Sequence, residues 1–305
     1  MTTRPLDLLD LPTIARYRND VLTLDIARAL TRGHPLGAMG LMAYVNPARH
    51  LYAALKKTED ASLLGGIIHT RGEPFAKLLY LAPRFNLKDP NLPELIEHLS
   101  AQAGEWQAFH VIAEVEETSD VFTALRRSGF AVYAWQRVWD VSQIQKTVSD
   151  PSRSWKRMQS VNLPAVQSLH YQIVPQLLHL IEPAPKRAEG FIYSDGHSYA
   201  NVSYGVYGVM LTPLIPPDAS DVSETIISLI NSLTDRRGRP VYINVRSYQA
   251  WLELVLEDLG ATALPRQAVM VKYLARLVKE AQPALVVPNN ARIQPTQMSR
   301  MESDE

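Results

Sequence analysis

Histidine and cysteine, the residue types that most often bind metals or attack substrates, form no recognisable site in this sequence. The chain has eight histidines and no cysteine, which excludes disulfides, thiol nucleophiles and cysteine-ligated metals. No two histidines have the H-x-H or H-x-x-x-H spacing of zinc sites, so we predict no metal. The sequence also lacks G-x-S-x-G, G-x-x-x-x-G-K and G-x-G-x-x-G, which are typical of hydrolases, NTPases and dinucleotide-binding proteins.

Three other side chains are candidates for moving a proton. Glu114 and Glu116 lie at the end of a predicted strand that starts near Val111, where a carboxylate could act as a general base. Tyr248 opens the last predicted helix and could act as a general acid. Solvent exposure is the simpler explanation for the two glutamates, and an aromatic residue at a helix start is more often used for packing.

The composition is that of a folded protein without net charge. The chain has 305 residues, 46% of them hydrophobic, with 31 Lys+Arg against 31 Asp+Glu. Because the total charge is zero, we predict no binding to nucleic acid and none to a membrane surface. The longest apolar stretch, residues 206–215, is too short to cross a bilayer. The first residues lack a signal-peptide core, so we expect a cytoplasmic protein.

Two stretches of similar size flank a polar segment that contains a proline. We predict an N-terminal domain over 1–148, a linker over 149–156, a C-terminal domain over 157–280 and a disordered tail over 281–305.

The two stretches repeat each other in pattern. Pro83 and Pro213 each close an apolar, strand-like run, and Gly129 and Gly260 each follow a helix-like segment, at an offset of about 130 residues. Each copy is predicted to run helix, helix, three strands, helix, strand, helix, strand. Duplication explains this agreement better than two unrelated α/β domains.

This succession resembles the GNAT superfamily of CoA-dependent N-acyltransferases. Gly129-Phe130 stands where that superfamily has Gly-Phe after a helix, and Gly65-Gly66 stands where its hairpin has glycine. The resemblance extends from residue 5 to residue 278, in two copies. It implies an α/β protein with a mixed sheet in each copy, that is, two GNAT-like acyl-CoA N-acyltransferase domains in tandem.

The resemblance also implies a cofactor site. Acetyl-CoA or another acyl-CoA would enter a split beside Leu81 and Ala82 in the first copy, next to the strand that starts near Val111. GNAT proteins bind the pyrophosphate with a glycine-containing loop, because glycine lets backbone N–H groups approach the phosphates at a helix start. Here the loops over 83–91 and 213–221 contain no glycine, so we expect weak binding at best, and only to the first copy. The residues that could compensate there are Arg84, Asn86 and Lys88.

The two helix starts after these loops also indicate weak phosphate binding. Asn91 with Glu94, and Asp221 with Glu224, have the spacing of a capping box, in which side chains satisfy the first backbone N–H groups of a helix. We predict that both boxes form and occupy the donors that a phosphate would use.

The general acid of the superfamily is missing from both copies. The resemblance places a tyrosine four positions before the late glycine, where it protonates the departing thiolate. Leucine occupies both positions here, at Leu125 and Leu256. Gln249 stands in the second copy where the superfamily often has an asparagine.

We favour a degenerate tandem protein that binds a ligand or partner with weak or no acyl transfer. One alternative is an active acetyltransferase that uses the first copy, with a small-molecule or peptide amine as acceptor. A second alternative is a structural or interaction protein whose clefts are filled by its own residues. An open or filled gap beside Leu81 and Leu211 discriminates between these, and the oligomeric state cannot be predicted.

Overall fold

The computed structural model describes residues 3–37, 49–58, 61–144 and 154–274. Within them the strands form one 14-stranded mixed sheet, in which neighbours follow the order β1-β3-β4-β5-β6-β14-β7-β12-β11-β10-β9-β8. The short strand β2 pairs with β5, and β13 pairs with β7. The α/β fold class is therefore confirmed.

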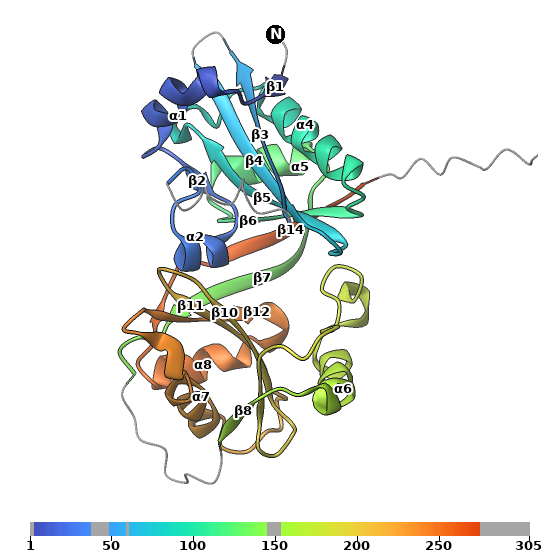
Figure 1. The fold of residues 1–305 in the computed structure, drawn as a ribbon, viewed down its shortest axis with the longest axis vertical. Coiled ribbons are helices and arrows are strands. Elements are labelled where there is room, and N and C mark those ends of the chain that lie inside the picture. Colours follow the sequence, from blue (N-terminus) through green and yellow to red (C-terminus); the bar gives the residue numbers. More distant parts are fainter. Residues whose placement is uncertain (1–2, 38–48, 59–60, 145–153, 275–305) are drawn as a thin grey trace, which may run out of the picture. The chain divides into compact units, whose positions relative to one another are not determined.

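The first half follows the predicted order of elements closely (Figure 1). Its helix α4 buries one apolar face because Leu92, Leu95, Ile96 and Leu99 recur at helical spacing, and it lies against β3 and β4. The elements of this half are β1 (Thr3–Pro5), α1 (Leu11–Tyr17), β2 (Leu22–Thr23), α2 (Ile26–Arg32), β3 (Arg49–Lys57), β4 (Ser62–Thr70), β5 (Phe75–Ala82), α4 (Leu92–Glu105), β6 (His110–Val115), α5 (Asp120–Arg127) and β7 (Ala131–Asp140).

The second half repeats the main elements of this order, with small differences such as the additional short strand β13. Its second predicted helix is only a 3-10 turn, Gln176–Leu178, after α6. Its elements are β8 (Trp155–Arg157), α6 (Leu163–Ile173), β9 (Phe191–Tyr193), β10 (Tyr199–Tyr204), β11 (Val209–Leu214), α7 (Val222–Asn231), β12 (Val241–Arg246), α8 (Trp251–Asp258), β13 (Thr262–Ala263) and β14 (Gln267–Tyr273).

The predicted linker over 149–156 is too long at its end. Trp155 and Lys156 belong to β8 and pair with Tyr193 and Ile192 of β9. Because the Trp155 indole is buried against the second core and donates to the Thr225 carbonyl at 2.9 Å, this segment is fixed in the fold. Residues 145–153 and the predicted tail over 281–305 lie outside the described residues.

In both halves the sheet splits, as predicted. In the first half β5 pairs in parallel with β6 only from Phe75↔His110 to Lys77↔Ile112, and the strands then diverge. In the second half β11 pairs with β12 from Val209↔Val241 only as far as Leu211↔Ile243. Each diverging pair is followed by a helix, α4 and α7 respectively.

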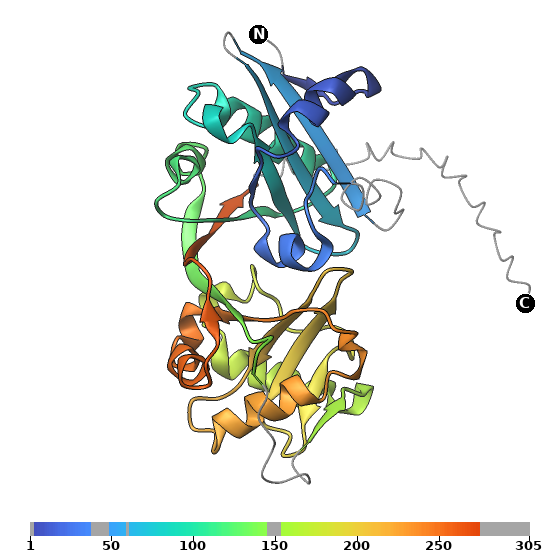
Figure 2. The same cartoon turned by 90° about the vertical axis from the view of Figure 1, so that its left-hand side faces the viewer.

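The two halves exchange their last strands. Strand β14, from the end of the second half, lies between β6 and β7 of the first half. The later part of β7 in turn pairs with β12 and β13 of the second half. These two long strands run side by side in both views (Figure 1 and Figure 2). Residues of both halves accordingly belong to one compact unit, and the predicted domain boundaries at 148 and 157 stay a prediction.

The exchange places residues of each half in the core of the other. Ala268 and Met270 of β14 are buried in the core beneath α4 and α5, together with Leu95 and Leu125. Trp139 of β7 is buried in the core of the second half. Among the described residues, no helix combines the length and the apolar character needed to cross a membrane.

We predict that Met270→Ala destabilises the first half although residue 270 lies in the second repeat. Met270 is fully buried, and emptying such a position costs about 2–5 kcal/mol in the free energy of unfolding. Urea denaturation measures the loss, and amide hydrogen exchange should show it at β6 and α5. The exposed Val206→Ala is the control. Faster exchange confined to β11 and α7 would contradict the shared core.

Candidate functional site

The split of the first half is filled by the chain itself. Strand β2 pairs antiparallel with β5, with Leu22 opposite Leu81 and Thr23 opposite Tyr80. The Leu24 N–H donates to the Leu79 carbonyl at 2.9 Å, which extends this ladder by one residue. Because β4 already occupies the other edge of β5 at these positions, β2 must lie on the edge from which β6 diverges.

The same segment also reaches β6, on the far side of the split. The Glu114 N–H donates to the Leu24 carbonyl at 2.9 Å, and the Ile26 N–H donates to Glu114 Oε2 at 2.8 Å. Leu24 itself is 1% exposed and packs in the first core. The residues around it, Val21-Leu22-Thr23, are β-branched or apolar and suit a short strand. Asp25 then ends the strand by capping α2, accepting from the Arg28 N–H at 3.2 Å.

Glu114 is a buried anchor of this segment. Its side chain is 3% exposed, with Oε1 at 3.9 Å from Lys77 Nζ, and the Asp25 carboxylate lies 3.5 Å from the same Nζ. The expectation of simple solvent exposure is therefore wrong for Glu114. It is correct for Glu116, which is exposed one residue beyond the end of β6. The structure separates the two candidate bases, and their catalytic role stays a prediction.

In the loop predicted to hold the cofactor, several polar groups already bond to other groups of the protein. The Arg84 N–H donates to the Asp20 carbonyl at 3.0 Å, again binding the segment before β2. The Lys88 Nζ lies 3.5 Å from Asp120, and the Asn86 side chain donates to Asp89 at 3.3 Å. Leu81 and Ala82, the strand residues before this loop, are fully buried.

Neither predicted capping box forms. The Asn91 side chain donates to Asp89 Oδ1 at 2.8 Å and makes no cap, and Glu94 instead pairs with Lys56 at 2.5 Å. Asp221 has left-handed backbone angles, φ 54° and ψ 46°, and its side chain makes no cap hydrogen bond. The Glu94 carboxylate thus pairs with the buried Lys56 ammonium group and not with the backbone N–H at the helix start, because hydrogen bonds between charged groups are stronger.

In the second half a side chain fills the split. The Gln249 amide is 2% exposed; its oxygen accepts from the Ile215 N–H at 3.1 Å, and its nitrogen donates to the Pro213 carbonyl at 2.9 Å. These are backbone groups at the end of β11, where β12 has diverged and can no longer pair with them. The position that the family resemblance marked for an asparagine therefore holds a structural amide.

The positions of the missing general acid are core positions. Leu125 and Leu256 are each 0% exposed and pack in the first and second cores respectively. Neither side chain faces a space that a substrate could enter, and a leucine has no proton to donate.

Tyr248 belongs to a polar cluster that the sequence did not reveal. Its hydroxyl donates to Glu182 Oε2 at 2.7 Å, and Tyr133 donates to Oε1 at 2.9 Å. Arg246 Nε lies 3.0 Å from the same Oε1. Glu182 comes from the irregular segment before β9, so only the tertiary fold brings these four residues together.

The charges in this cluster oppose the role of Tyr248 as an acid. Burial and the adjacent Glu182 carboxylate raise the pKa of Tyr248 well above its ordinary value. Burial alone would also raise the pKa of Glu182, but Arg246 and the two tyrosine hydroxyls outweigh it and hold that pKa below its ordinary value. The tyrosine therefore keeps its proton, and the glutamate is ionised at neutral pH.

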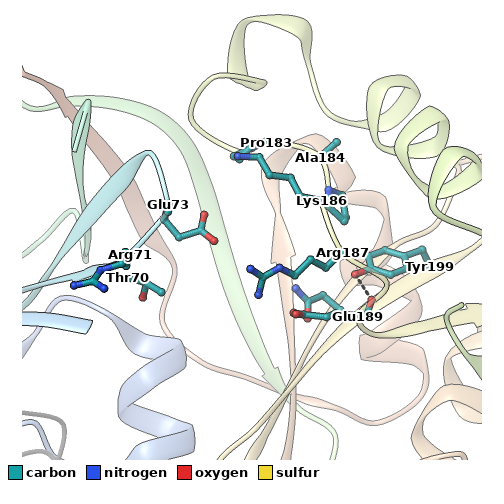
Figure 3. A pocket seen from close by; sticks show the side chains of 12 residues that line it. Thr70, Arg71, Glu73, Pro183, Ala184, Lys186, Arg187, Glu189 and Tyr199 are labelled. Atoms are coloured by element: carbon teal, nitrogen blue, oxygen red, sulfur yellow. Dashed lines mark hydrogen bonds between the residues drawn. The ribbon is translucent and has the colours of Figure 1, made fainter. Parts of the chain in front are cut away.

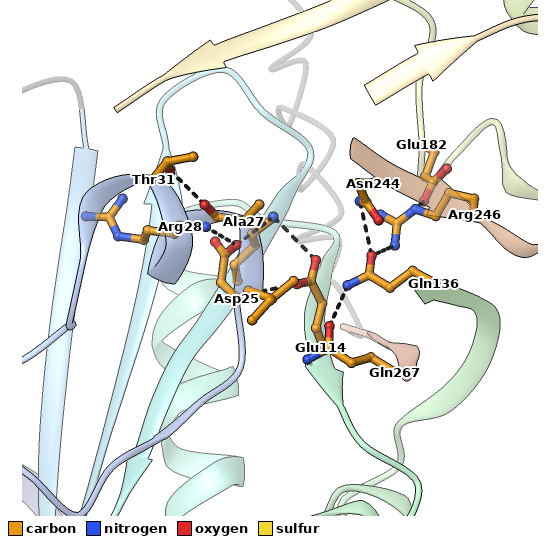
Figure 4. Close-up of polar contacts among 12 residues, drawn as sticks. Asp25, Ala27, Arg28, Thr31, Glu114, Gln136, Glu182, Asn244, Arg246 and Gln267 are labelled. Carbon is orange, nitrogen blue, oxygen red and sulfur yellow. Dashed lines mark hydrogen bonds and ion pairs between the residues drawn. The ribbon is translucent and has the colours of Figure 1, made fainter. Parts of the chain in front are cut away.

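The cluster continues towards the shared strands through amides. Arg246 donates to Gln136 Oε1, which also accepts from Asn244 at 3.3 Å, and Gln136 donates to Gln267 at 2.9 Å (Figure 4). Gln136 and Gln267 lie on β7 and β14, so this chain of hydrogen bonds joins the two exchanged strands.

Two neighbouring cavities lie between the end of β4 and strand β10. One, of about 420 Å³, is lined by Asp25, Arg28, Arg32, Arg49, Lys77 and residues of β10. The other, of about 330 Å³, is lined by residues 70–73 and 183–187, with Glu189, Tyr199 and Asn201 (Figure 3). Tyr199 donates to the Glu189 carbonyl at 2.8 Å and closes one wall. Within the described ranges, no three His, Asp or Glu side chains are grouped as metal ligands.

Comparison with solved structures identifies the fold. This chain is similar to a GCN5-related N-acetyltransferase from Sphaerobacter thermophilus, at 12% identity and a TM-score of 0.52, over 89% of this chain and 95% of that one. It is also similar to a tandem GNAT protein from the clavulanic acid biosynthesis pathway, at 12% identity and a TM-score of 0.50, over 90% of this chain and 99% of that one. The chain thus has the tandem GNAT fold that the family resemblance implied. No family model matches the sequence, and no curated protein matches it either.

We predict that Gln249→Ala destabilises the second half. Without the amide, the buried Ile215 N–H and the Pro213 carbonyl lose their partner, at a cost of about 1–3 kcal/mol for each group. Urea denaturation measures the free energy of unfolding. Gln172→Ala, which removes an exposed amide from α6, is the control, and equal stability of the two variants would show that water replaces Gln249.

We also predict that Glu182 contributes to the acid sensitivity of the fold. Because its pKa is lowered in the folded state, its contribution is complete above its unfolded value of 4.5 and is lost as the pH falls through the folded value. Glu182→Gln should lower the free energy of unfolding at pH 7 by roughly 3–5 kcal/mol, since Arg246 loses its anion. The difference from the wild type should shrink below pH 4.5. Urea titrations at several pH values test this, with the exposed Glu257→Gln as control.

Proposed function

We propose that this chain is a tandem GNAT-fold protein that binds a ligand without efficient acyl transfer. The observation that supports this most strongly is the position of β2. An acyl-CoA that entered the first split as it does in acetyltransferases would have to displace the segment from Asp20 to Leu24.

Displacing that segment is unfavourable. The N–H groups of Leu24, Arg84 and Glu114 would all lose their present partners, and Leu24 would leave the core. The cofactor could replace some of the hydrogen bonds, but it would compete with a segment of the same chain, whose effective concentration is on the order of millimolar or higher. We therefore expect any affinity for acyl-CoA to be weak.

Two further features support the same proposal. The loop after β5 offers no glycine, and the Arg84 amide at its start is already bonded. In both halves the position of the general acid is a buried leucine. General acid catalysis typically contributes 10²–10⁴-fold, so acyl transfer would be slow even if the cofactor bound.

A purely structural role is the second candidate, because Gln249 and β2 fill both splits as that alternative requires. We favour a ligand-binding role because two cavities with charged walls are open, and Asp25 and Lys77, next to the first split, line one of them. Active transfer by the first copy would require β2 to leave its place.

We predict that 1 mM acetyl-CoA leaves the Tm of the full-length protein unchanged and that no free CoA accumulates with a panel of amines. A ligand at 100 times its Kd would add about 2.7 kcal/mol, which a thermal-shift assay detects readily. Hydrogen exchange of the Leu24 and Glu114 amides should stay slow with and without acetyl-CoA. A rise in Tm together with faster exchange of the Leu24 amide would instead favour the active acetyltransferase.

A further inference from the structure

Three arginines face the larger of the two cavities. Arg28 and Arg32 are four residues apart on α2 and therefore lie on one face of the helix. Arg49 begins β3, opposite Thr70 of β4. All three side chains are partly buried. The cavity of about 420 Å³ is within the range of small-molecule sites.

The other cation of the cavity, Lys77, differs from the arginines in being paired. Its Nζ lies 3.5 Å from Asp25 and 3.9 Å from Glu114. Asp25 therefore makes two interactions, because its side chain pairs with Lys77 and also accepts from the Arg28 N–H at the start of α2. Within the described part of the chain, none of the three arginines forms an ion pair, and the remaining acid in the lining, Glu73, is exposed.

The arginines repel one another. Like charges four residues apart on a helix destabilise it, and here burial weakens the screening by solvent. Burial lowers the pKa of Arg28, and the charges of Arg32 and Arg49 lower it further, although Asp25 opposes them. Burial and Arg49 likewise lower the pKa of Arg32. Asp25 opposes both shifts, but the lining carries four cationic side chains against the two carboxylates of Asp25 and Glu73, so positive charge is in excess.

We propose that this arginine pocket binds a small polyanion that carries phosphate or carboxylate groups. Guanidinium groups hold five N–H donors in a planar fork that matches the paired oxygens of both anions, and three of them can bind more than one such group. Asn201 and Ser203 of β10 line the same cavity with exposed polar side chains, which suit hydroxyl groups of the ligand. The inference deepens the proposed function and rests on it, because it names the ligand class of a protein that does not transfer acyl groups.

The test is a titration of the full-length protein with sodium pyrophosphate and, separately, with citrate, each against sodium chloride at matched ionic strength. We expect at least one of the two anions to raise the Tm beyond the chloride effect, and the preferred anion distinguishes phosphate from carboxylate ligands. Calorimetry should show about tenfold or greater weakening of this anion in Arg28→Gln and in Arg32→Gln, since each removes charge-assisted hydrogen bonds.

Arg127→Gln, which removes an exposed arginine from α5, should bind as the wild type does. In chloride alone the two pocket variants should be at least as stable as the wild type, because they relieve repulsion; this also confirms that they fold. The proposal is overturned if neither anion exceeds the chloride control, or if all three variants bind equally. Acetyl-CoA that entered the split would speed exchange of the Leu24 amide, whereas an anion in the arginine pocket would lose affinity in Arg28→Gln. The two proposals can therefore fail separately.

Discussion

Parallel strands that diverge leave backbone N–H and C=O groups without partners, and buried groups of this kind must be satisfied by something. This constraint governs both halves of the molecule. In the first half the segment from Asp20 to Leu24 forms a ladder with β5 and reaches across to β6 at Glu114. In the second half Gln249 serves the end of β11 with one amide group. At both splits the chain therefore uses its own residues to satisfy these groups.

The elements with strong periodicity were predictable from the sequence. The apolar face of α4, the runs of β5 and β11, and the near-constant offset between the copies depend on local pattern, and the structure confirms them. Strand β2 was not predictable, because two residues show no alternation, and its partners Tyr80 and Leu81 are far away in sequence. The capping box of α4 was predicted wrongly for a related reason. Glu94 forms an ion pair with Lys56 of β3, which is distant in sequence, instead of bonding to the backbone at the helix start.

The exchanged strands and the Glu182 cluster could not be predicted from the sequence either, because both depend on contacts between residues far apart in the chain. Nothing in the local sequence of β7 or β14 indicates which half it completes. Glu182, in an irregular segment, shows no motif, yet it is the anion of Arg246 and accepts from two tyrosines. The sequence indicates only that Tyr248 lies at a helix start, whereas in the structure its hydroxyl is held by a hydrogen bond to the Glu182 carboxylate.

The Glu182 cluster and the arginine pocket differ in charge balance, and this difference indicates a structural role for the first and a binding role for the second. Around Glu182 every described charge has an opposite partner within hydrogen-bond distance, as expected for groups that hold strands β7 and β12 together. Around Arg28, Arg32 and Arg49 the cations outnumber the anions, and the nearest acids are already committed to Lys77 and to the start of α2. Strand β2 and Gln249 supply hydrogen bonds to the backbone at the two splits, whereas no ion pair among the described residues involves the three arginines of the cavity. The excess of positive charge around these arginines is therefore best explained by the binding of an anion from outside the chain.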